Sequence, residues 1–293
     1  MEDNNTVFQQ DLSKDDSRVH IFFMQLLMKE KCPTPEKAFM QEVLEKHLGA
    51  IESLRLSEKN AGFAAKNYSA EFDGKNVNPM LMISDCCDSN NEKIDAFTRS
   101  QMWDCPEHEK ILSECGYQVV ANDVLGDALN TADRAEMLMN FLEALIELYP
   151  TCEAVYFHNS GKLFTAEQIR SHDISGGSRF IYFAVNVSFF NIQGTDDMMV
   201  DTLGMDIVGL PDLQYHFHDF DPNDVVNHAY NLLSYIFENN CPIKSGDTID
   251  GMQNGQMSMD VQWKCHFEDS LIQPSRPVID ICMNEFASGQ REY

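Results

Sequence analysis

Basic residues are scarce in this chain, which holds 21 Lys and Arg against 47 Asp and Glu and a formal net charge of −26. Binding to nucleic acid or to an anionic membrane begins with neutralisation of phosphates by basic groups, so we expect neither partner. Residues 191–250 contain eleven acidic residues and a single base, Lys244. Such a surface suits a basic protein partner or metal cations, although acidity also serves simply to keep a cytoplasmic protein soluble.

Paired cysteine motifs and long apolar runs are also absent. The nine cysteines are odd in number, and no two have the C-x-x-C spacing of zinc or redox motifs. The apolar stretch VHIFFMQLLMKEK is too short and interrupted to span a bilayer, and the acidic N-terminal segment does not resemble a signal peptide. We therefore expect a cytoplasmic protein with reduced thiols. Cys86-Cys87 lies between Asp85 and Asp88, whose carboxylates disfavour a catalytic thiolate.

No complete enzyme signature is present. The Asn159–Lys162 segment resembles the end of a phosphate-binding loop, but it lacks the Gly and the Ser/Thr that such a loop requires. The D-x-D-x-N run at 219–223 begins like a calcium loop, but Asp224 stands where that loop needs Gly. Cys105 and His108 have zinc-like spacing without a second pair. The sequence thus favours a protein that is not an enzyme.

The apolar patterns predict an α+β fold with mixed or antiparallel sheets and packed helices. Residues 18–28 and 178–190 read as strands, 131–149 as a long helix and 258–267 as an alternating strand. The first half follows the order strand, helix, hairpin, helix, strand, which is compatible with a ferredoxin-like unit.

The predicted domains follow from the same patterns. Residues 1–16 are polar and are expected to lack stable structure. A seam near 126–131 would separate two α+β lobes, 17–126 and 127–293, unless the two form one continuous unit.

The segment LQYHFHDFDPND at 213–224 has two interpretations. In the structural one, alternate residues of a strand face the core and His216 and His218 face solvent. A helix then begins with Asp221 as N-cap, Pro222 in the first turn and Asp224 near the positive end of the helix dipole. This interpretation explains the acidic residues without a ligand but leaves the two histidines unexplained.

In the functional interpretation, His216 and His218 are metal ligands. Their Cα atoms would lie roughly 7 Å apart on one strand face, a geometry in which two imidazoles can chelate one divalent ion. A catalytic zinc needs a third protein ligand. Asp219 and the distant His266 are the candidates, and spacing alone identifies neither.

The chain as a whole resembles the bacterial domain of unknown function 4261 family. The resemblance rests on MWDCPEHEKILSECGYQVVANDVLG, on EALIELYPTCEAVYFHNSGKL and above all on TLGMDIVGLPDLQYHFHDFDPNDVVNHAYNLLSYIFENN with the following GDTIDG. These segments cover most of residues 100–251. The resemblance supports the α+β fold and implies no activity or site residues.

Two functions from different classes remain. The first is a non-enzymatic binding module whose acidic surface covers a basic protein partner, in the manner of a toxin antagonist. The second is a metal-dependent enzyme centred on His216 and His218, with Asp219 as a further binding candidate and no other cofactor.

Overall fold

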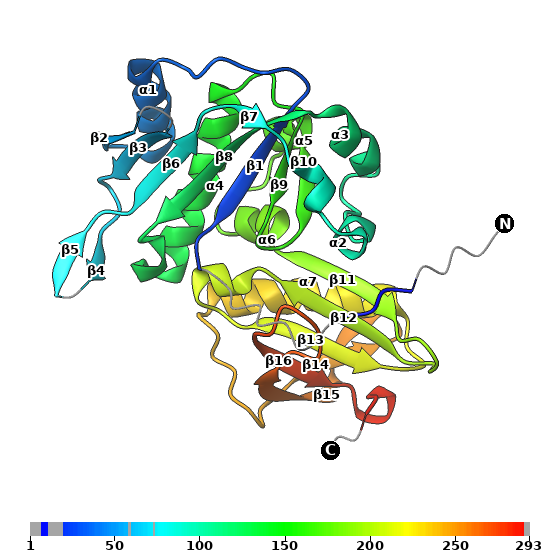
Figure 1. Cartoon of the computed structure of the whole chain (residues 1–293). Helices are drawn as coiled ribbons and strands as arrows, with labels where there is room; N and C mark the ends of the chain where they lie inside the picture. The colour runs from blue at the N-terminus through cyan, green and yellow to red at the C-terminus, as the bar shows by residue number, and fades with distance from the viewer. Residues whose placement is uncertain (1–6, 11–19, 58–59, 73, 290–293) are drawn as a thin grey trace. The chain divides into compact units, whose positions relative to one another are not determined.

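The computed structural model describes residues 7–10, 20–57, 60–72 and 74–289 (Figure 1). The chain divides into two units. The N-terminal unit comprises residues 20–186 with 207–209, and the C-terminal unit holds the remaining described residues. The seam expected near 126–131 falls inside the N-terminal unit, and most of the 1–16 segment lies outside the described residues.

Helices and antiparallel or mixed sheets occur together in the described chain, so the α+β class is confirmed. None of the helices formed by the described residues has the length and apolar character needed to cross a bilayer.

The N-terminal unit is built on one antiparallel sheet with the strand order β10-β9-β1-β8-β6-β3-β2, and β7 pairs with β8 at its side. A separate antiparallel pair is formed by β4 and β5. The strands of this unit are β1 (Phe23–Met28), β2 (Ile51–Ser57), β3 (Asn60–Ala65), β4 (Ala70–Phe72), β5 (Lys75–Val77), β6 (Met80–Ser84), β7 (Cys87–Asp88), β8 (Tyr117–Val124), β9 (Ala154–Phe157) and β10 (Lys162–Thr165).

This strand order differs from that of a ferredoxin-like unit. There, a single strand separates the first strand from the one that follows its helix. Here β8, β6 and β3 all lie between β1 and β2. The predicted order of elements is present, but the pairing partners of β1 are the distant strands β8 and β9, which no local pattern specifies.

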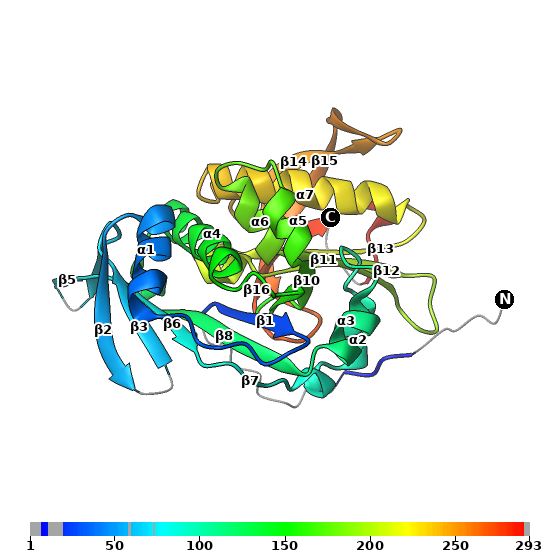
Figure 2. The same cartoon turned by 90° about the horizontal axis from the view of Figure 1, so that it is seen from above.

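Helices cover both faces of this sheet. Helix α4 packs against α1, α5 and α6, and Figure 2 shows α1 and α4 on the same side of the strands. On the other face, α3 contributes to a core cluster that includes Leu27 of β1 and Tyr156 of β9. The helices are α1 (Lys37–Leu48), α2 (Ala96–Ser100), α3 (His108–Glu114), α4 (Thr131–Leu148), α5 (Ala166–Ser171) and α6 (Ser178–Ala184), with 3-10 turns η1 (Asn91–Lys93) and η2 (Gly126–Ala128).

The C-terminal unit is a mixed sheet covered on one face by helix α7 (Pro222–Glu238). Its strand order is β11-β12-β13-β16-β15-β14, and the central pair β13–β16 is parallel. The strands are β11 (Asn186–Asn191), β12 (Met198–Leu203), β13 (Asp212–Phe217), β14 (Thr248–Gln253), β15 (Gln256–Asp269) and β16 (Pro277–Cys282), with 3-10 turns η3 (Met205–Val208) and η4 (Asn284–Phe286).

Helix α7 begins where local sequence rules place it. The Asp221 carboxylate accepts a hydrogen bond of 2.9 Å from the backbone N–H of Asn223, Pro222 occupies the first turn and Asp224 follows in that turn. The predicted N-cap is therefore confirmed. The face of α7 that packs onto the sheet carries the buried residues Val225, His228, Ala229, Leu232, Leu233 and Ile236.

Candidate functional site

The two predicted histidines contact different partners. His216 lies on β13, and its Nε2 atom is 3.3 Å from a carboxylate oxygen of Asp197, in the connection between β11 and β12. His218 follows β13, and its Nδ1 atom is 3.1 Å from the Asp219 carboxylate. Asp219 has a left-handed backbone (φ 51°) and an almost fully exposed side chain. Each histidine therefore faces its own carboxylate.

The strand face that carries His216 is not the solvated surface that the sequence suggests. Gln214, on the same face, is fully buried. Its amide donates to Asp201 (3.1 Å) and accepts from the backbone N–H of Leu271 (3.1 Å). The reason is topological, because β13 is a central strand and residue 271, in the β15–β16 connection, lies over this face at Gln214. The side chain of His216 is only 14 % exposed, whereas that of His218 is 35 % exposed.

The described residues bring no third ligand to the histidine pair. Among them there is no group of three or more His, Cys, Asp or Glu side chains arranged to hold a metal ion. His266, the distant candidate, lies on β15 in register with Asp280 of β16, two strands away from β13.

We expect removal of metal to leave the C-terminal unit unchanged. Dialysis of untagged protein against EDTA should shift its melting temperature by less than about 1 °C, because a two-histidine site without a third ligand holds zinc weakly. Differential scanning calorimetry before and after dialysis measures this shift, and elemental analysis gives the metal content. Stoichiometric zinc, lost together with several degrees of stability, would contradict this prediction.

The polar face of the C-terminal sheet contains a buried ion cluster. The guanidinium group of Arg276 donates to Asp212 (3.1 Å), to Asp201 (2.6 Å) and to the backbone carbonyl of Thr202 (2.5 Å). Burial opposes ionisation of Arg276, but the two carboxylates outweigh it and raise its pKa above the ordinary value. Asp212 also accepts from the Thr202 hydroxyl and from the backbone N–H groups of Gly204 and Met205.

This cluster joins β12, β13 and the start of β16. The side chains of Arg276, Asp201 and Asp212 are at most 4 % exposed. Because their charges are satisfied by one another and are closed to solvent, the cluster supports the fold and offers no position for a substrate.

The apolar face of the same sheet holds a second buried network. The Tyr215 hydroxyl is 2.8 Å from Nδ1 of His228, and Nε2 of His228 is 2.8 Å from the backbone carbonyl of Asp250. Burial lowers the pKa of His228, which favours a neutral ring that donates to Asp250 and accepts from Tyr215. Trp263 packs against this ring at 4.7 Å, and Gly251 leaves room for it, since a Cβ there would approach the indole to 2.7 Å.

The network fixes the hairpin β14–β15 to the sheet and to α7. Strand β16 pairs with β15 over residues 264–269. Strand β14 pairs with residues 256–258 and 262–264 of β15, and residues 259–261 form a bulge between these two paired segments. The hairpin turns at Asn254-Gly255, both with positive φ. A Cβ on Gly255 would lie 3.6 Å from the Asp224 carboxylate, so the turn lies beside the first turn of α7.

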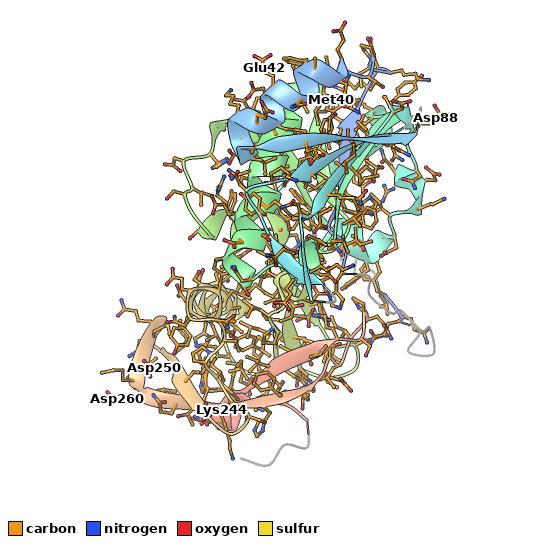
Figure 3. All side chains as sticks on the ribbon, turned by 90° about the vertical axis from the view of Figure 1, so that its left-hand side faces the viewer. Met40, Glu42, Asp88, Lys244, Asp250 and Asp260 are labelled. Atoms are coloured by element: carbon orange, nitrogen blue, oxygen red, sulfur yellow. The ribbon has the colours of Figure 1, made fainter. Side chains whose placement is uncertain are left out.

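This hairpin exposes apolar and acidic side chains together. Met259 is 80 % exposed and Met257 is 48 % exposed. Asp250 lies on β14 and Asp260 on β15, at one end of the C-terminal unit (Figure 3). Asp250 accepts from Gln262, which also donates to the Met259 carbonyl, so one side chain links the two strands. We call Asp224, Asp250, Met257, Met259 and Asp260 the hairpin patch.

The charge around the hairpin patch is strongly one-sided. In the described part of 187–289, Lys244 and Lys264 are the lysines that reach solvent, and the one arginine, Arg276, is buried. Solvent-accessible carboxylates are far more numerous: Asp196, Asp197, Asp206, Asp219, Asp221, Asp224, Glu238, Asp247, Asp250, Asp260, Glu268, Asp269 and Glu285.

The N-terminal unit contributes an open groove of about 470 Å³ between α1, α4 and α5. Its lining carboxylates are already engaged. Glu147 lies 2.7 Å from Lys46 and 2.8 Å from His47, and the contacts with Lys46 and His47 lower its pKa. Glu143 contacts Arg179 at 2.5 Å and His172 at 3.4 Å. The two carboxylates of the groove are thus paired with neighbouring basic residues, and no sequence motif predicts this arrangement.

The strongest comparison falls on the C-terminal unit. Residues 201–282 match the model of a family described as "Domain of unknown function (DUF4261)". No curated protein and no solved structure matches this chain. The matched residues contain the buried ion cluster, α7 and the hairpin patch, and they confirm the family resemblance for the segment from TLGMDIV to GDTIDG. Residues 201–282 are thus similar to this family, and the family description assigns no chemistry.

Proposed function

We propose that this chain is a non-enzymatic binding module and that its hairpin patch engages a basic surface of a partner protein. The observation that carries the proposal is Met259, which is 80 % exposed in the bulge of β15, next to Asp260. The buried polar networks of the same unit are closed to solvent, so a substrate could not reach them. Their role would be to hold the hairpin in place.

The apolar part of the patch would supply most of the affinity. Methionine is flexible and polarisable, and exposed methionines adapt to partners of different shape. Residues 256–258 pair with β14 and lie outside the segment of β15 that pairs with β16, and an edge of this kind can accept a strand from a partner. A contact that buries both methionines would remove apolar surface from water, and this burial stabilises a complex by about 25 cal/mol for each Å² of apolar surface.

The charged part of the patch would select the partner. Complementary potentials raise association rates and exclude partners of like charge, while exposed charge pairs at the rim add little affinity. The excess of carboxylates over Lys244 and Lys264 therefore favours a lysine- and arginine-rich surface and disfavours nucleic acid. The same argument makes binding sensitive to salt, because exposed charges are screened beyond about 8 Å at physiological ionic strength.

Replacing both exposed methionines should weaken binding. The probe is an amphipathic peptide of alternating lysine and leucine residues, with a matched glutamate–leucine peptide as its counterpart. We expect Met257→Ser with Met259→Ser to weaken binding of the basic peptide at least about tenfold, which corresponds to about 1.4 kcal/mol. Fluorescence anisotropy at low and at physiological salt measures both affinities.

Matched variants on the same strand test whether the effect is local. Phe267 is 43 % exposed and Asp269 is exposed, both outside the hairpin patch. We expect Phe267→Ser and Asp269→Asn to retain wild-type affinity, and Asp250→Asn with Asp260→Asn to slow association. Equal binding of the two peptides, or equal affinity of the methionine double variant and the wild-type protein, would contradict the proposal.

A further inference from the structure

Two cysteines that are distant in sequence meet in the N-terminal unit. Cys32 lies in the loop between β1 and α1, and Cys86 directly follows β6. The Cys86 thiol is near enough to Cys32 to raise the pKa of the Cys32 thiol. The adjacent residues tie the same two segments together, because the Thr34 hydroxyl donates to the Asp85 carboxylate at 2.7 Å. Both cysteines are free thiols in this structure.

A buried tyrosine lies beside this pair. Tyr149 follows α4, and only 2 % of the residue is exposed. Its hydroxyl has no hydrogen-bond partner among the described residues. Burial raises the pKa of Tyr149, and Cys32, Cys86 and Asp85 raise it further, so these groups lie in the same region of the unit. A buried hydroxyl without a partner is uncommon, and a thiolate is a strong acceptor for it.

Exposure distinguishes the two members of the pair. Cys32 is half-buried, whereas Cys86 is 7 % exposed. A small oxidant can therefore reach Cys32, and the less exposed Cys86 would act as the resolving thiol. Cys87 is exposed next to Cys86, and its sulfur accepts a long contact of 3.8 Å from the Gln118 amide.

We propose that Cys32 and Cys86 form a reversible disulfide in response to low-molecular-weight disulfides such as oxidised glutathione, with the Tyr149 hydroxyl stabilising the sulfur that carries the negative charge. This modification site is independent of the hairpin patch, which lies in the other unit.

The chemistry balances in two exchange steps. The Cys32 thiol loses its proton, and the thiolate attacks one sulfur of glutathione disulfide, so that a mixed disulfide forms and one glutathione thiolate leaves. The Cys86 thiol then loses its proton and attacks the Cys32 sulfur, which releases the second glutathione. Two thiols are oxidised, one glutathione disulfide is reduced to two glutathiones, and the two protons pass to the departing thiolates.

The environment of Cys32 sets the rate. Burial, followed by the neighbouring Cys86 thiol, raises the pKa of Cys32 to about 12. Little Cys32 thiolate exists near neutral pH, so oxidation is slow there. As the pH is raised toward the pKa of Cys32, the rate of oxidation should increase about tenfold per pH unit. The pair would therefore stay reduced in an ordinary cytoplasm and respond to sustained oxidation.

The test incubates the full chain with glutathione disulfide, blocks remaining thiols with iodoacetamide and maps peptides by mass spectrometry without reduction. We expect a cross-linked peptide pair that contains Cys32 and Cys86, reversed by dithiothreitol. The oxidised protein should melt roughly 5–10 °C higher, because the bond closes a long loop. Tyr149→Phe should slow the exchange several-fold while the protein remains folded.

Three variants make the outcome decisive. Cys86→Ser should stop the reaction at a glutathione adduct on Cys32, Cys32→Ser should abolish the cross-link, and Cys87→Ser should leave its yield unchanged. The proposal is overturned if the cross-link joins Cys87 instead of Cys86. It is equally overturned if wild-type protein accumulates only glutathione adducts, or if Cys32 remains unmodified at pH 9 while Cys87 reacts.

Discussion

Replacing Arg276 with methionine is expected to lower the free energy of unfolding of the C-terminal unit by about 3–5 kcal/mol. The cause is the buried charge that remains. Asp201 and Asp212 would lose their common guanidinium partner in a site that solvent does not reach. The carbonyl of Thr202 would lose its donor as well. A loss of this size is a large part of the stability of an ordinary domain.

Urea unfolding of this unit can be followed by the fluorescence of Trp263, which is buried there, in a Trp103→Phe background. Lys244→Met is the matched control, because it also removes a base from the C-terminal unit but at an exposed position. It should change stability by no more than about 0.5 kcal/mol. Equal stabilities of the Arg276 and Lys244 variants would show that the cluster does not support the fold.

A similar loss is expected in the N-terminal unit when Arg134 is replaced by methionine. Arg134 is 3 % exposed and lies 3.1 Å from the equally buried Asp123 carboxylate. It also donates to the backbone carbonyls of His20 and Ile207. Removing it leaves a buried carboxylate without a cation and two carbonyls without donors, for an expected cost of about 3–5 kcal/mol.

The pH dependence of the stability of this variant shows whether the charge of Asp123 causes the loss. Burial raises the pKa of Asp123 above its ordinary value, and Arg134 opposes that rise. Without Arg134 the pKa of Asp123 in the folded state rises further. A carboxyl with a raised folded-state pKa stabilises the fold at low pH and loses that contribution as the pH increases through this pKa. The deficit should therefore be larger at about pH 7 than at about pH 5.

Unfolding of the Arg134 variant can be followed by hydrogen exchange of β1 and β8, with the exposed Lys93→Met as control. A deficit that does not change with pH would show that lost packing, and not the charge of Asp123, is responsible.

Local rules were sufficient where neighbouring residues determine the structure. Asp221 and Pro222 begin α7 as predicted, because N-capping depends only on the next few residues. The helix predicted over 131–149 forms as α4 over residues 131–148, since the apolar spacing of this segment is strongly helical. The predicted strand over 178–190 was wrong in its first half, where α6 forms. Its buried residues Phe180, Ile181, Phe183 and Ala184 follow a helical period that a short apolar run conceals.

The predicted outer face of β13 failed for a different reason. Alternation correctly identifies which residues share a face, but not whether another segment covers it. Gln214 is buried because residue 271 folds over it, 57 positions later in the chain. Arg276 likewise meets Asp212 and Asp201 across 64 and 75 positions. Such contacts depend on the tertiary fold, and no periodic pattern in a single sequence predicts them.

Part of the hairpin patch could be predicted from the sequence. The Asn254-Gly255 turn between apolar segments is a strong hairpin signal, and Gln253 and Gln256 pair across it. The alternation of residues 258–267 predicts that Met259 and Phe267 point to the same side of the strand as Trp263 and Cys265. The structure buries Trp263 and Cys265 and exposes the other two, because β15 extends past the strand that pairs with it and carries a bulge opposite Asp250 and Gly251.

The hairpin patch as a partner-binding surface can be tested most directly by chemical-shift mapping. Isotope-labelled protein is titrated with the lysine–leucine peptide, and backbone amide shifts are followed residue by residue. We predict that the largest shifts fall within 250–263 and the first turn of α7 and are reduced in the Met257→Ser, Met259→Ser double variant. Shifts centred on His216 and Asp197, or spread evenly over the acidic surface, would contradict a binding function for the hairpin patch.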